Sequence, residues 1–424
     1  MRRLFLSLVT VLTLTAVMVT AACVPAAPAT SIPGTVVTIG FTTSITGKYV
    51  RESTDQTNGL KLWIDQVNEV GGIRLANGDI ATLAYKTYDD QSDIAQTEAL
   101  YQKLILEDNV DFLIGPYSSG LTNAAAPVAD LNGKIMISAG AASNASFQRN
   151  YKSVYQIYTP ASGYLTPALD ILSTLDPAAK SIAILHEDEP FSKSAVQSVS
   201  DALLAQGFTV VYIESYPGGA TDFSAYVQNL RAAQPDAILG GGHVADGMLL
   251  AQELAKQGVQ AKLITLLVAP SDPSFGNLGN AALGITGPSQ WEPDAAYSSI
   301  SAFDAGLPWY GPSVPEFVLS YQQAYGKDPT YFAAGGYAAG LALQYAIEQA
   351  GTTQTDLVLA ALDSTNIVTF FGRLQFDTAA ETHGLQIGHE MVYMQWQQDT
   401  TGAMVKRVVW PVNLATAPLL YPIP

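Results

Sequence analysis

Basic residues, cysteine and charge in general are scarce in this chain. Only 13% of its 424 residues are charged, and 20 Lys and Arg face 37 Asp and Glu, for a formal net charge of −17. General nucleic-acid binding is excluded, since it needs clustered Lys and Arg to displace counterions from phosphates. A single cysteine excludes an internal disulfide framework and thiolate zinc or iron–sulfur sites. The 48% of hydrophobic residues suffices for one large or two medium cores.

Signatures of catalysis and of nucleotide binding are also missing. The chain has no GxSxG, GxxxxGK[ST] or GxGxxG segment, and Gly240-Gly241-Gly242 lacks the third glycine of the last pattern, because Ala245 stands there. The four histidines are His186, His243, His383 and His389, and none forms an HxxxH pair. The acids at 89–90 and 187–189 follow strands, where capping of the next helix is favoured over acid–base chemistry. The sequence therefore predicts no enzyme, no metal and no cofactor.

The N-terminus has the pattern of an export signal. Arg2 and Arg3 precede an apolar run at 4–19, which is too short for a comfortable membrane span. Residues 20–23 (TAAC) are similar to a bacterial lipobox, so we expect cleavage after residue 22 and a lipid on Cys23, with plain cleaved secretion as the alternative. The mature chain, without Arg2 and Arg3, would have a formal net charge of −19. Residues 23–35, rich in Ala and Pro, then form a tether.

From residue 35 onward, β-branched apolar runs alternate with segments of helical period, which is typical of a parallel sheet covered by helices. Strands are predicted at 36–41, 110–115, 134–138, 181–186, 209–213, 236–240, 262–267, 367–371, 373–376, 390–396 and 405–410. Leu60, Trp63, Ile64 and Val67 form one buried helical stripe. Longer helices are expected at 314–325 and 338–350. This length favours two α/β lobes.

Short segments spread over the body carry a family resemblance. They are 40–47 (GFTTSITG), 58–59 (NG), 68–73 (NEVGGI), 88–90 (YDD), 114–120 (IGPYSSG), 137–143 (ISAGAAS), 221–224 (TDFS) and 336–339 (GYAA). In order and spacing they resemble the branched-chain amino acid (Leu/Ile/Val-type) substrate-binding proteins of ABC importers. The resemblance implies a type I periplasmic-binding-protein fold, in which two doubly wound α/β lobes are joined by a three-strand hinge.

The same resemblance divides the chain between the lobes. We expect the hinge to cross near 156–160, 285–289 and 372–375. Lobe I then comprises 36–157 and 289–372, and lobe II comprises 158–288 and 373–424. Each lobe is discontinuous in sequence.

The loops after two predicted strands of lobe I are small and hydroxylic. In open α/β sheets ligands bind beyond the carboxyl ends of the strands, and helix N-termini there favour anions. The resemblance implies that Ser118 or Ser119, the backbone at Ala141, and Ser143 hold a ligand carboxylate. Alternatively, these residues only make turns and helix caps.

Aromatic residues are expected to complete the clamp. The resemblance places Phe191 and His243 of lobe II at positions where the family carries aromatics, although Phe191 can equally pack under its own loop. Tyr49 and Tyr117 are rim candidates from lobe I. Trp291, just past the second crossing, either walls the cleft or stiffens the hinge.

One expected feature of an amino-acid site is missing. The family places an acid for the ligand's α-ammonium after the strand at 262–267, where this chain has Val-Ala-Pro-Ser at 268–271. Asp272, Asp246 or Glu292 could replace it, because a buried ammonium needs a partner. Alternatively, the ligand is a carboxylate or amide without an ammonium. Both alternatives stay open.

The resulting hypothesis is an extracytoplasmic, lipid-anchored binding protein. It captures a small-molecule ligand and delivers it to ABC permease subunits, as a monomer without cofactor or catalysis. A ligand-sensing receptor component without transport is the main alternative, and a hydrolase is a lesser one.

Overall fold

The computed structural model describes residues 34–294 and 297–424. The predicted signal segment, Cys23 and nearly all of the tether lie outside the described residues. Among the described helices, none combines the length and apolar character that a membrane crossing requires.

The first sheet has six strands in the order β2-β3-β1-β4-β5-β6. All neighbouring pairs are parallel except β2 with β3. Its strands are β1 (Thr35–Thr43), β2 (Ile73–Arg74), β3 (Ile80–Asp89), β4 (Phe112–Gly115), β5 (Met136–Ser138) and β6 (Val154–Gln156). The order reverses beside β1, so the connections of this doubly wound sheet pass over both faces.

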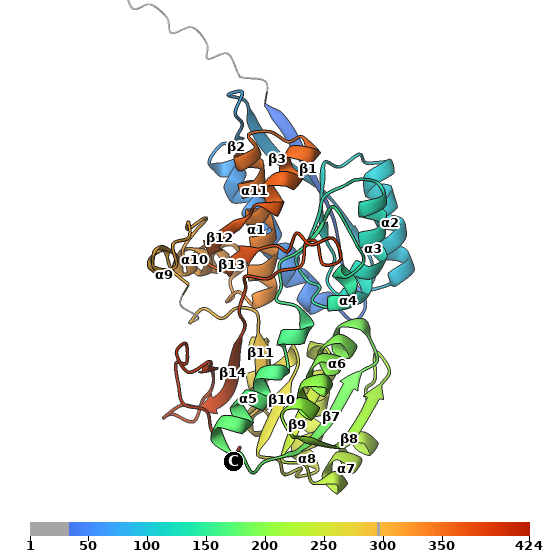
Figure 1. The fold of residues 1–424 in the computed structure, drawn as a ribbon, viewed down its shortest axis with the longest axis vertical. Helices are drawn as coiled ribbons and strands as arrows, with labels where there is room; N and C mark the ends of the chain where they lie inside the picture. Colours follow the sequence, from blue (N-terminus) through green and yellow to red (C-terminus); the bar gives the residue numbers. More distant parts are fainter. Residues whose placement is uncertain (1–33, 295–296) are drawn as a thin grey trace, which may run out of the picture. The chain divides into compact units, whose positions relative to one another are not determined.

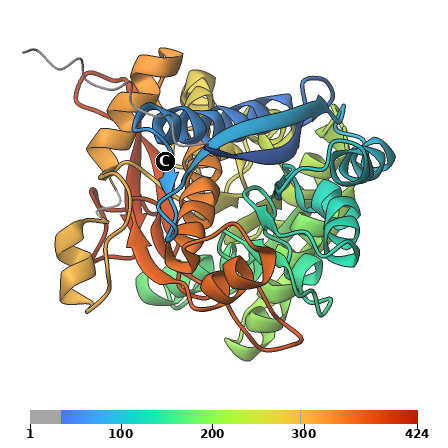
Figure 2. The same cartoon turned by 90° about the horizontal axis from the view of Figure 1, so that it is seen from above.

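Helices from two distant parts of the chain lie in the same half of the structure as this sheet (Figure 1). The N-terminal ones are α1 (Val50–Glu69), α2 (Ile94–Leu106), α3 (Ser119–Leu131) and α4 (Asn144–Phe147). The later ones are α9 (Ser299–Asp304), α10 (Val314–Tyr325), α11 (Tyr331–Ala350) and α12 (Thr355–Asp363). Figure 2 shows α11, in orange, beside the blue α1. The predicted stripe of α1 is confirmed, since Leu60, Trp63, Ile64 and Val67 are all buried.

The second sheet has seven strands in the order β15-β14-β11-β10-β9-β7-β8. They are β7 (Ser181–Glu187), β8 (Thr209–Tyr216), β9 (Ala237–Gly241), β10 (Leu263–Leu266), β11 (Thr286–Ser289), β14 (Val392–Gln398) and β15 (Met404–Trp410). Its helical elements are η1 (Ala161–Gly163), α5 (Thr166–Leu175), α6 (Pro190–Ala205), α7 (Ser224–Ala233), α8 (Val244–Lys256), η2 (Ala269–Ser271) and η3 (Pro273–Ala281). The strands β7 to β11 pair in parallel, and β14 and β15 add an antiparallel edge.

We call the first sheet with its helices lobe I, and the second sheet with its helices lobe II. The predicted two-lobed α/β architecture of type I is confirmed, and every strand predicted above corresponds to a strand of the structure. The strands β2, β3, β6 and β11 are not among the predicted strands, although β11 lies within the predicted crossing at 285–289. In β3 the second half is half-buried or exposed, and β2, β6 and β11 have two, three and four residues, too few for a periodic pattern.

Three segments pass between the lobes and are tied together by polar side chains. Gln290 accepts a hydrogen bond from the Thr159 backbone N–H at 2.9 Å, and the Thr159 hydroxyl lies 2.7 Å from His389 Nδ1. The third passage therefore lies beside His389. Its predicted position at 372–375 forms β13 (Gly372–Gln375) instead, which pairs with β12 (Asn366–Thr369) in a separate hairpin. Phe376 still packs on Tyr155 of β6, so the predicted boundary at 373 is too early in the chain.

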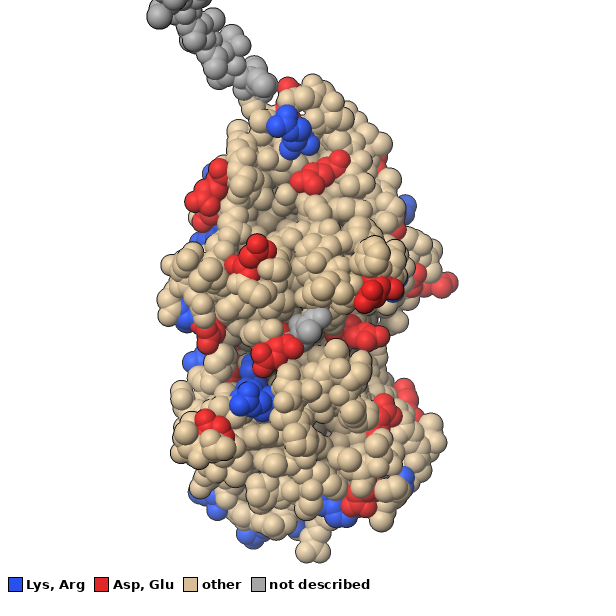
Figure 3. Space-filling view, turned by 90° about the vertical axis from the view of Figure 1, so that its left-hand side faces the viewer, with Lys and Arg blue, Asp and Glu red and all other residues tan. Residues whose placement is uncertain are grey.

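Charged side chains are sparse on the face shown in Figure 3, where acids and bases are interspersed on a mostly uncharged surface.

Candidate functional site

A pocket lies where the carboxyl ends of strands from both sheets meet. Tyr117 and Ser119 follow β4, Gly140 follows β5, and His243 and Val268 follow β9 and β10. The cavity between these residues is small in this arrangement of the lobes, about 10 Å³, which is the space of about one water. The lining residues are Tyr117, Ser119, Gly140, Ala142, Tyr158, Tyr164, Phe191, His243, Val268 and Tyr331. This is the edge where open α/β sheets bind small molecules.

The lobe I wall is built from the two small-residue loops. Ser119 Oγ accepts hydrogen bonds from the backbone N–H groups of Ala142 and Ser143, at 3.1 and 3.0 Å. With its oxygen accepting twice, the hydroxyl proton of Ser119 remains available to an incoming acceptor. At Gly140 the loop packs closely on its neighbours, because a Cβ there would lie 2.2 Å from Gln56 Oε1 and 3.0 Å from Tyr117 Cα. The wall therefore offers the Ser119 hydroxyl to a carboxylate or amide without any basic side chain.

Aromatic rings make most of the remaining wall. Tyr164 and Phe191 meet edge to face with centroids 4.9 Å apart, and Tyr158 and Tyr331 do so at 5.6 Å. Gln290 Nε2 donates to the Tyr164 hydroxyl at 2.8 Å, which ties this ring to the hinge. Tyr158, Tyr164 and Tyr331 were missed by sequence reasoning. The only signal was that Tyr158 lies within the predicted first crossing.

The predicted carboxylate-binding residues divide into lining and supporting groups. Ser119 lines the pocket, whereas Ser118 is the buried N-cap of α3. Gly140 and Ala142 reach the pocket in place of Ala141 and Ser143, which are fully buried beside them. The Ala141 carbonyl accepts a hydrogen bond from Gln156.

The predicted aromatic residues divide in the same way. Tyr117, Phe191 and His243 line the pocket. Tyr49 lies behind them, with its ring centroid 4.8 Å from that of His243. Trp291 is outside the lining, because its ring packs against Phe317 and Phe370 and its N–H donates to the Phe370 carbonyl. Of its two predicted roles, this placement favours the hinge.

No acid is among the pocket-lining residues described above. Val268 stands at the wall, with φ of 25°, an uncommon angle for a β-branched residue. Asp272 caps η3 and pairs with Arg51 at 3.2 Å. Asp246 accepts from the His243 backbone and from the Tyr216 hydroxyl. Glu292 pairs with Lys406 at 2.8 Å. The three candidate replacements are thus each engaged elsewhere.

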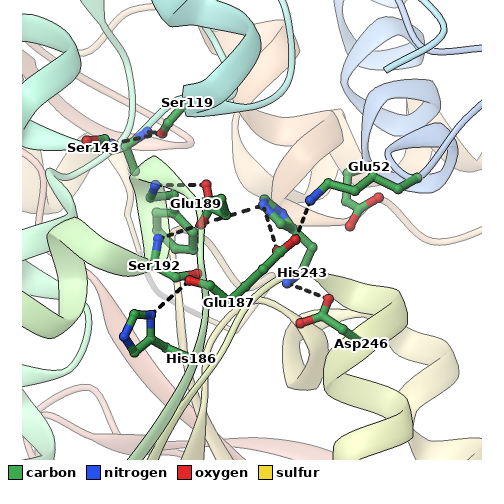
Figure 4. A network of polar contacts seen from close by, with 12 residues as sticks. Glu52, Ser119, Ser143, His186, Glu187, Glu189, Ser192, His243 and Asp246 are labelled. Atoms are coloured by element: carbon green, nitrogen blue, oxygen red, sulfur yellow. Dashed lines mark hydrogen bonds and ion pairs between the residues drawn. The ribbon is translucent and has the colours of Figure 1, made fainter. Parts of the chain in front are cut away.

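Polar contacts bridge the two lobes around the pocket. Lys48 of lobe I pairs with Glu187 at the end of β7, at 2.5 Å. The carboxylate of Glu52, in α1, accepts from the Val244 backbone N–H at 3.1 Å. The Tyr117 hydroxyl lies 3.0 Å from His243 Nδ1. Figure 4 shows Glu52, Glu187 and His243 converging here. These contacts need both lobes, so they hold the closed arrangement.

Burial shifts the protonation of these groups. Burial, together with the nearby charges of Asp246 and Asp272, raises the pKa of Glu52 to about 7. Burial likewise raises the pKa of Asp246 to about 6 and lowers that of His243 well below its usual value. His243 is therefore neutral at pH 7, with one bare ring nitrogen.

We predict that ligand affinity falls as the pH rises from 5 to 7. Glu52 has a pKa of about 7 in the closed form, whereas an exposed glutamate titrates near 4.3. Closing the lobes therefore takes up a proton in this interval, and closure weakens as protons become scarce, by about tenfold or more overall. Calorimetric titration at several pH values measures this. In Glu52→Gln, whose amide oxygen can still accept from the Val244 N–H, the affinity should change less with pH. An unchanged pH dependence would contradict the assignment of Glu52 as the titrating group.

The two lobes, the three crossings and the pocket between strand ends define a bilobal solute-binding protein. The chain belongs to the periplasmic binding protein family, whose model matches residues 36–402. The predicted family is thereby confirmed.

Curated relatives of the Leu/Ile/Val type extend over most of the chain. The leucine-specific-binding protein of Salmonella typhimurium is 26% identical over 358 residues, 82% of this chain and 88% of that protein. The leucine-, isoleucine-, valine-, threonine- and alanine-binding protein of Pseudomonas aeruginosa is 25% identical over 376 residues, 85% and 90% of the two chains.

Solved structures share the fold. A leucine-binding protein from Thermotoga maritima has a TM-score of 0.73 at 20% identity, covering 87% of this chain and 97% of that one. An ABC transporter solute-binding protein from Rhodopseudomonas palustris, in complex with benzoate, has a TM-score of 0.73 at 18% identity, covering 91% and 98%.

Proposed function

We propose that this chain is an extracytoplasmic lipoprotein, anchored through Cys23, that captures a small carboxylate or amide between its lobes and delivers it to an ABC importer. The observation that carries the proposal is the pocket at the meeting strand ends, walled by Ser119 and the 140–142 backbone on one side and by aromatic rings on the other. Family membership and the lipobox-like residues 20–23 support the delivery role and the location.

We propose further that the ligand lacks an α-ammonium. Val268 stands at the pocket wall where the family expects an acid, and Asp272, Asp246 and Glu292 are held by other partners. The buried acids Glu187 and Glu189 contact His243 and are outside the pocket lining. A buried ammonium without a carboxylate is strongly disfavoured. Aromatic rings such as Tyr164 and Phe191 suit a flat or branched apolar body. The complex of one structural neighbour with benzoate fits this class.

Binding proceeds by closure of the lobes around the ligand. In the open form, the lobe I wall binds the carboxyl group. Rotation at the hinge then brings Phe191 and His243 over it and forms the contacts of Lys48 and Glu52 across the cleft. Affinity arises because the ligand contacts the closed form more extensively than the open one. The permease recognises the closed monomer, and no bond of the ligand is broken.

A thermal-shift panel on the purified protein tests this function. We expect leucine's keto acid, aromatic acids or short amides to raise the melting temperature, because a ligand that binds only the folded form stabilises it by mass action. Recovery of the unchanged ligand distinguishes binding from hydrolysis. Failure of every carboxylate and amide, or stabilisation by amino acids alone, would contradict the proposal.

Removing the Ser119 hydroxyl should weaken binding specifically. A hydrogen bond to a charged group contributes about 1.5–3 kcal/mol, so Ser119→Ala is expected to raise the Kd about 10- to 100-fold. Ser118→Ala is the matched control, because Ser118 is a buried neighbour outside the pocket lining, and should leave the Kd nearly unchanged. Equal losses in both variants would mean that the loop, and not the hydroxyl, matters.

A further inference from the structure

Glu187, Glu189 and His243 form a cluster of potential metal ligands in lobe II, which we call the lobe II triad. Their ligand atoms all lie within 4.8 Å of one another, and His243 Nε2 is 3.9 Å from Glu187 Oε2 and 3.9 Å from Glu189 Oε1. The side chains are 5%, 2% and 9% exposed for His243, Glu187 and Glu189. Figure 4 shows the imidazole of His243 reaching towards both carboxylates.

Two atoms that face each other in this cluster have no hydrogen-bond partner. They are His243 Nε2 and Glu187 Oε2, both buried. A separation of 3.9 Å is too long for a direct hydrogen bond. Leaving buried polar groups of this kind unsatisfied costs about 1–3 kcal/mol each. Something placed between the two atoms would satisfy both.

We propose that the lobe II triad binds a divalent transition-metal cation of the Zn²⁺ or Mn²⁺ class. Zinc bonds to His nitrogen and carboxylate oxygen are about 2.0–2.2 Å long, so ligands of one ion lie about 3–4 Å apart, close to the observed 3.9 Å. One imidazole and two carboxylates are a ligand set that such ions accept.

The surroundings of each ligand suit this role. His243 Nδ1 lies 3.0 Å from the Tyr117 hydroxyl, a partner that can hold the proton on Nδ1 and leave Nε2 bare for the ion. Glu189 is fixed as the N-cap of α6 by the N–H groups of Phe191 and Ser192. Glu187 is oriented through its other oxygen, Oε1, by Lys48.

The charge balance also favours a cation. The triad carries two negative charges, and the buried acids Glu52 and Asp246 lie in the same region. Lys48 neutralises one charge and opposes the ion, but it comes from lobe I, whereas the three ligands all belong to lobe II. The three ligands therefore share one lobe, whereas the contacts of Tyr117 and Lys48 that orient His243 and Glu187 form when the lobes close. Because His243 also lines the solute pocket, the ion would brace one wall of it.

Calorimetric titration of the EDTA-treated full chain with ZnCl₂ and with MnCl₂, at pH 7.5 without phosphate, tests the proposal. We expect one site with a Kd in the low micromolar range or tighter for at least one of the two ions. His243→Gln and Glu187→Gln should each weaken it at least about tenfold, and Lys48→Met should tighten it about tenfold by removing a nearby positive charge. Co²⁺ substitution gives a second readout, since its visible absorption should disappear in His243→Gln.

Matched controls separate this site from adventitious binding. His186→Gln and His383→Gln remove the histidine beside Glu187 and a histidine paired with Asp363 at 2.8 Å, and both should keep the wild-type affinity. Circular dichroism in EDTA checks that each variant folds, and if one ligand variant fails to fold the other carries the test. The proposal would be overturned if neither ion binds, if the ligand variants bind the ion as tightly as the wild type, or if His383→Gln loses metal affinity. A water would then be the bridging group.

Discussion

Replacing Val268 with glutamate is expected to shift the preference of the pocket from acids without an ammonium to amino acids by at least about 100-fold. Val268 lines the pocket after β10, on a wall that holds no acid among the described lining residues. A carboxylate there supplies the missing partner for a buried ammonium. It also leaves a buried, unpaired charge when the ligand is a keto acid or benzoate. Both effects move the ratio of the two affinities in the same direction.

Calorimetry with leucine and with its keto acid measures this ratio in the wild type and in Val268→Glu. The matched control is Val268→Gln, which introduces a side chain of the same shape without the charge. Its gain in affinity for leucine should be much smaller than that of Val268→Glu. A wild type that already prefers leucine would contradict the assignment of the ligand class. An unchanged ratio in Val268→Glu would show that residue 268 is not near the α-carbon of the ligand.

Adding a methyl group at Gly336 is expected to destabilise the fold by about 2–4 kcal/mol. The helices α1 and α11 pack so closely that a Cβ at Gly336 would lie 2.0 Å from the Gln56 carbonyl oxygen. The reciprocal position, Gly59, would place a Cβ 1.9 Å from the Ala333 carbonyl. These neighbours are backbone atoms, so relief requires a helix to move. Since α1 begins beside Lys48 and carries Glu52, ligand binding should weaken as well.

Urea unfolding followed by circular dichroism gives the free energy of unfolding for Gly336→Ala. The matched control is Gly120→Ala in α3, where a Cβ would meet only Ser118 Oγ at 3.8 Å. That change should be neutral or stabilising by up to about 1 kcal/mol, because alanine favours the helix. If Gly336→Ala lowers the free energy of unfolding by less than about 0.5 kcal/mol, α1 and α11 can move apart at little cost.

Local patterns in the sequence predicted much of the fold. Apolar runs marked strands such as β7 and β10, and the spacing of Leu60, Trp63 and Val67 marked the buried side of α1. Such patterns succeed because strand and helix periods depend on neighbouring residues only. They failed for β3, whose second half is half-buried or exposed without a clear alternation. They also failed for the third crossing, because a hairpin at 372–375 and a crossing strand have the same local pattern.

The candidate site was predicted in part. Ser119, Phe191 and His243 were expected at strand ends and do line the pocket. The close packing behind Gly336 and the place of Tyr331 were not expected, since both depend on α11 meeting elements from the other end of the chain. The acids at 187–189 were expected to cap a helix, and Glu189 does so.

The sequence by itself determined the class of protein, the order of most strands and helices, and the small-residue loops that follow β4 and β5. Only the tertiary structure decided which side chains share the pocket, that Val268 faces it, and that Glu187 and Glu189 meet His243. The reason is physical. Secondary structure follows from periodicity within about ten residues, whereas a site assembled from strand ends depends on sheet order and lobe closure, which bring together residues far apart in the chain.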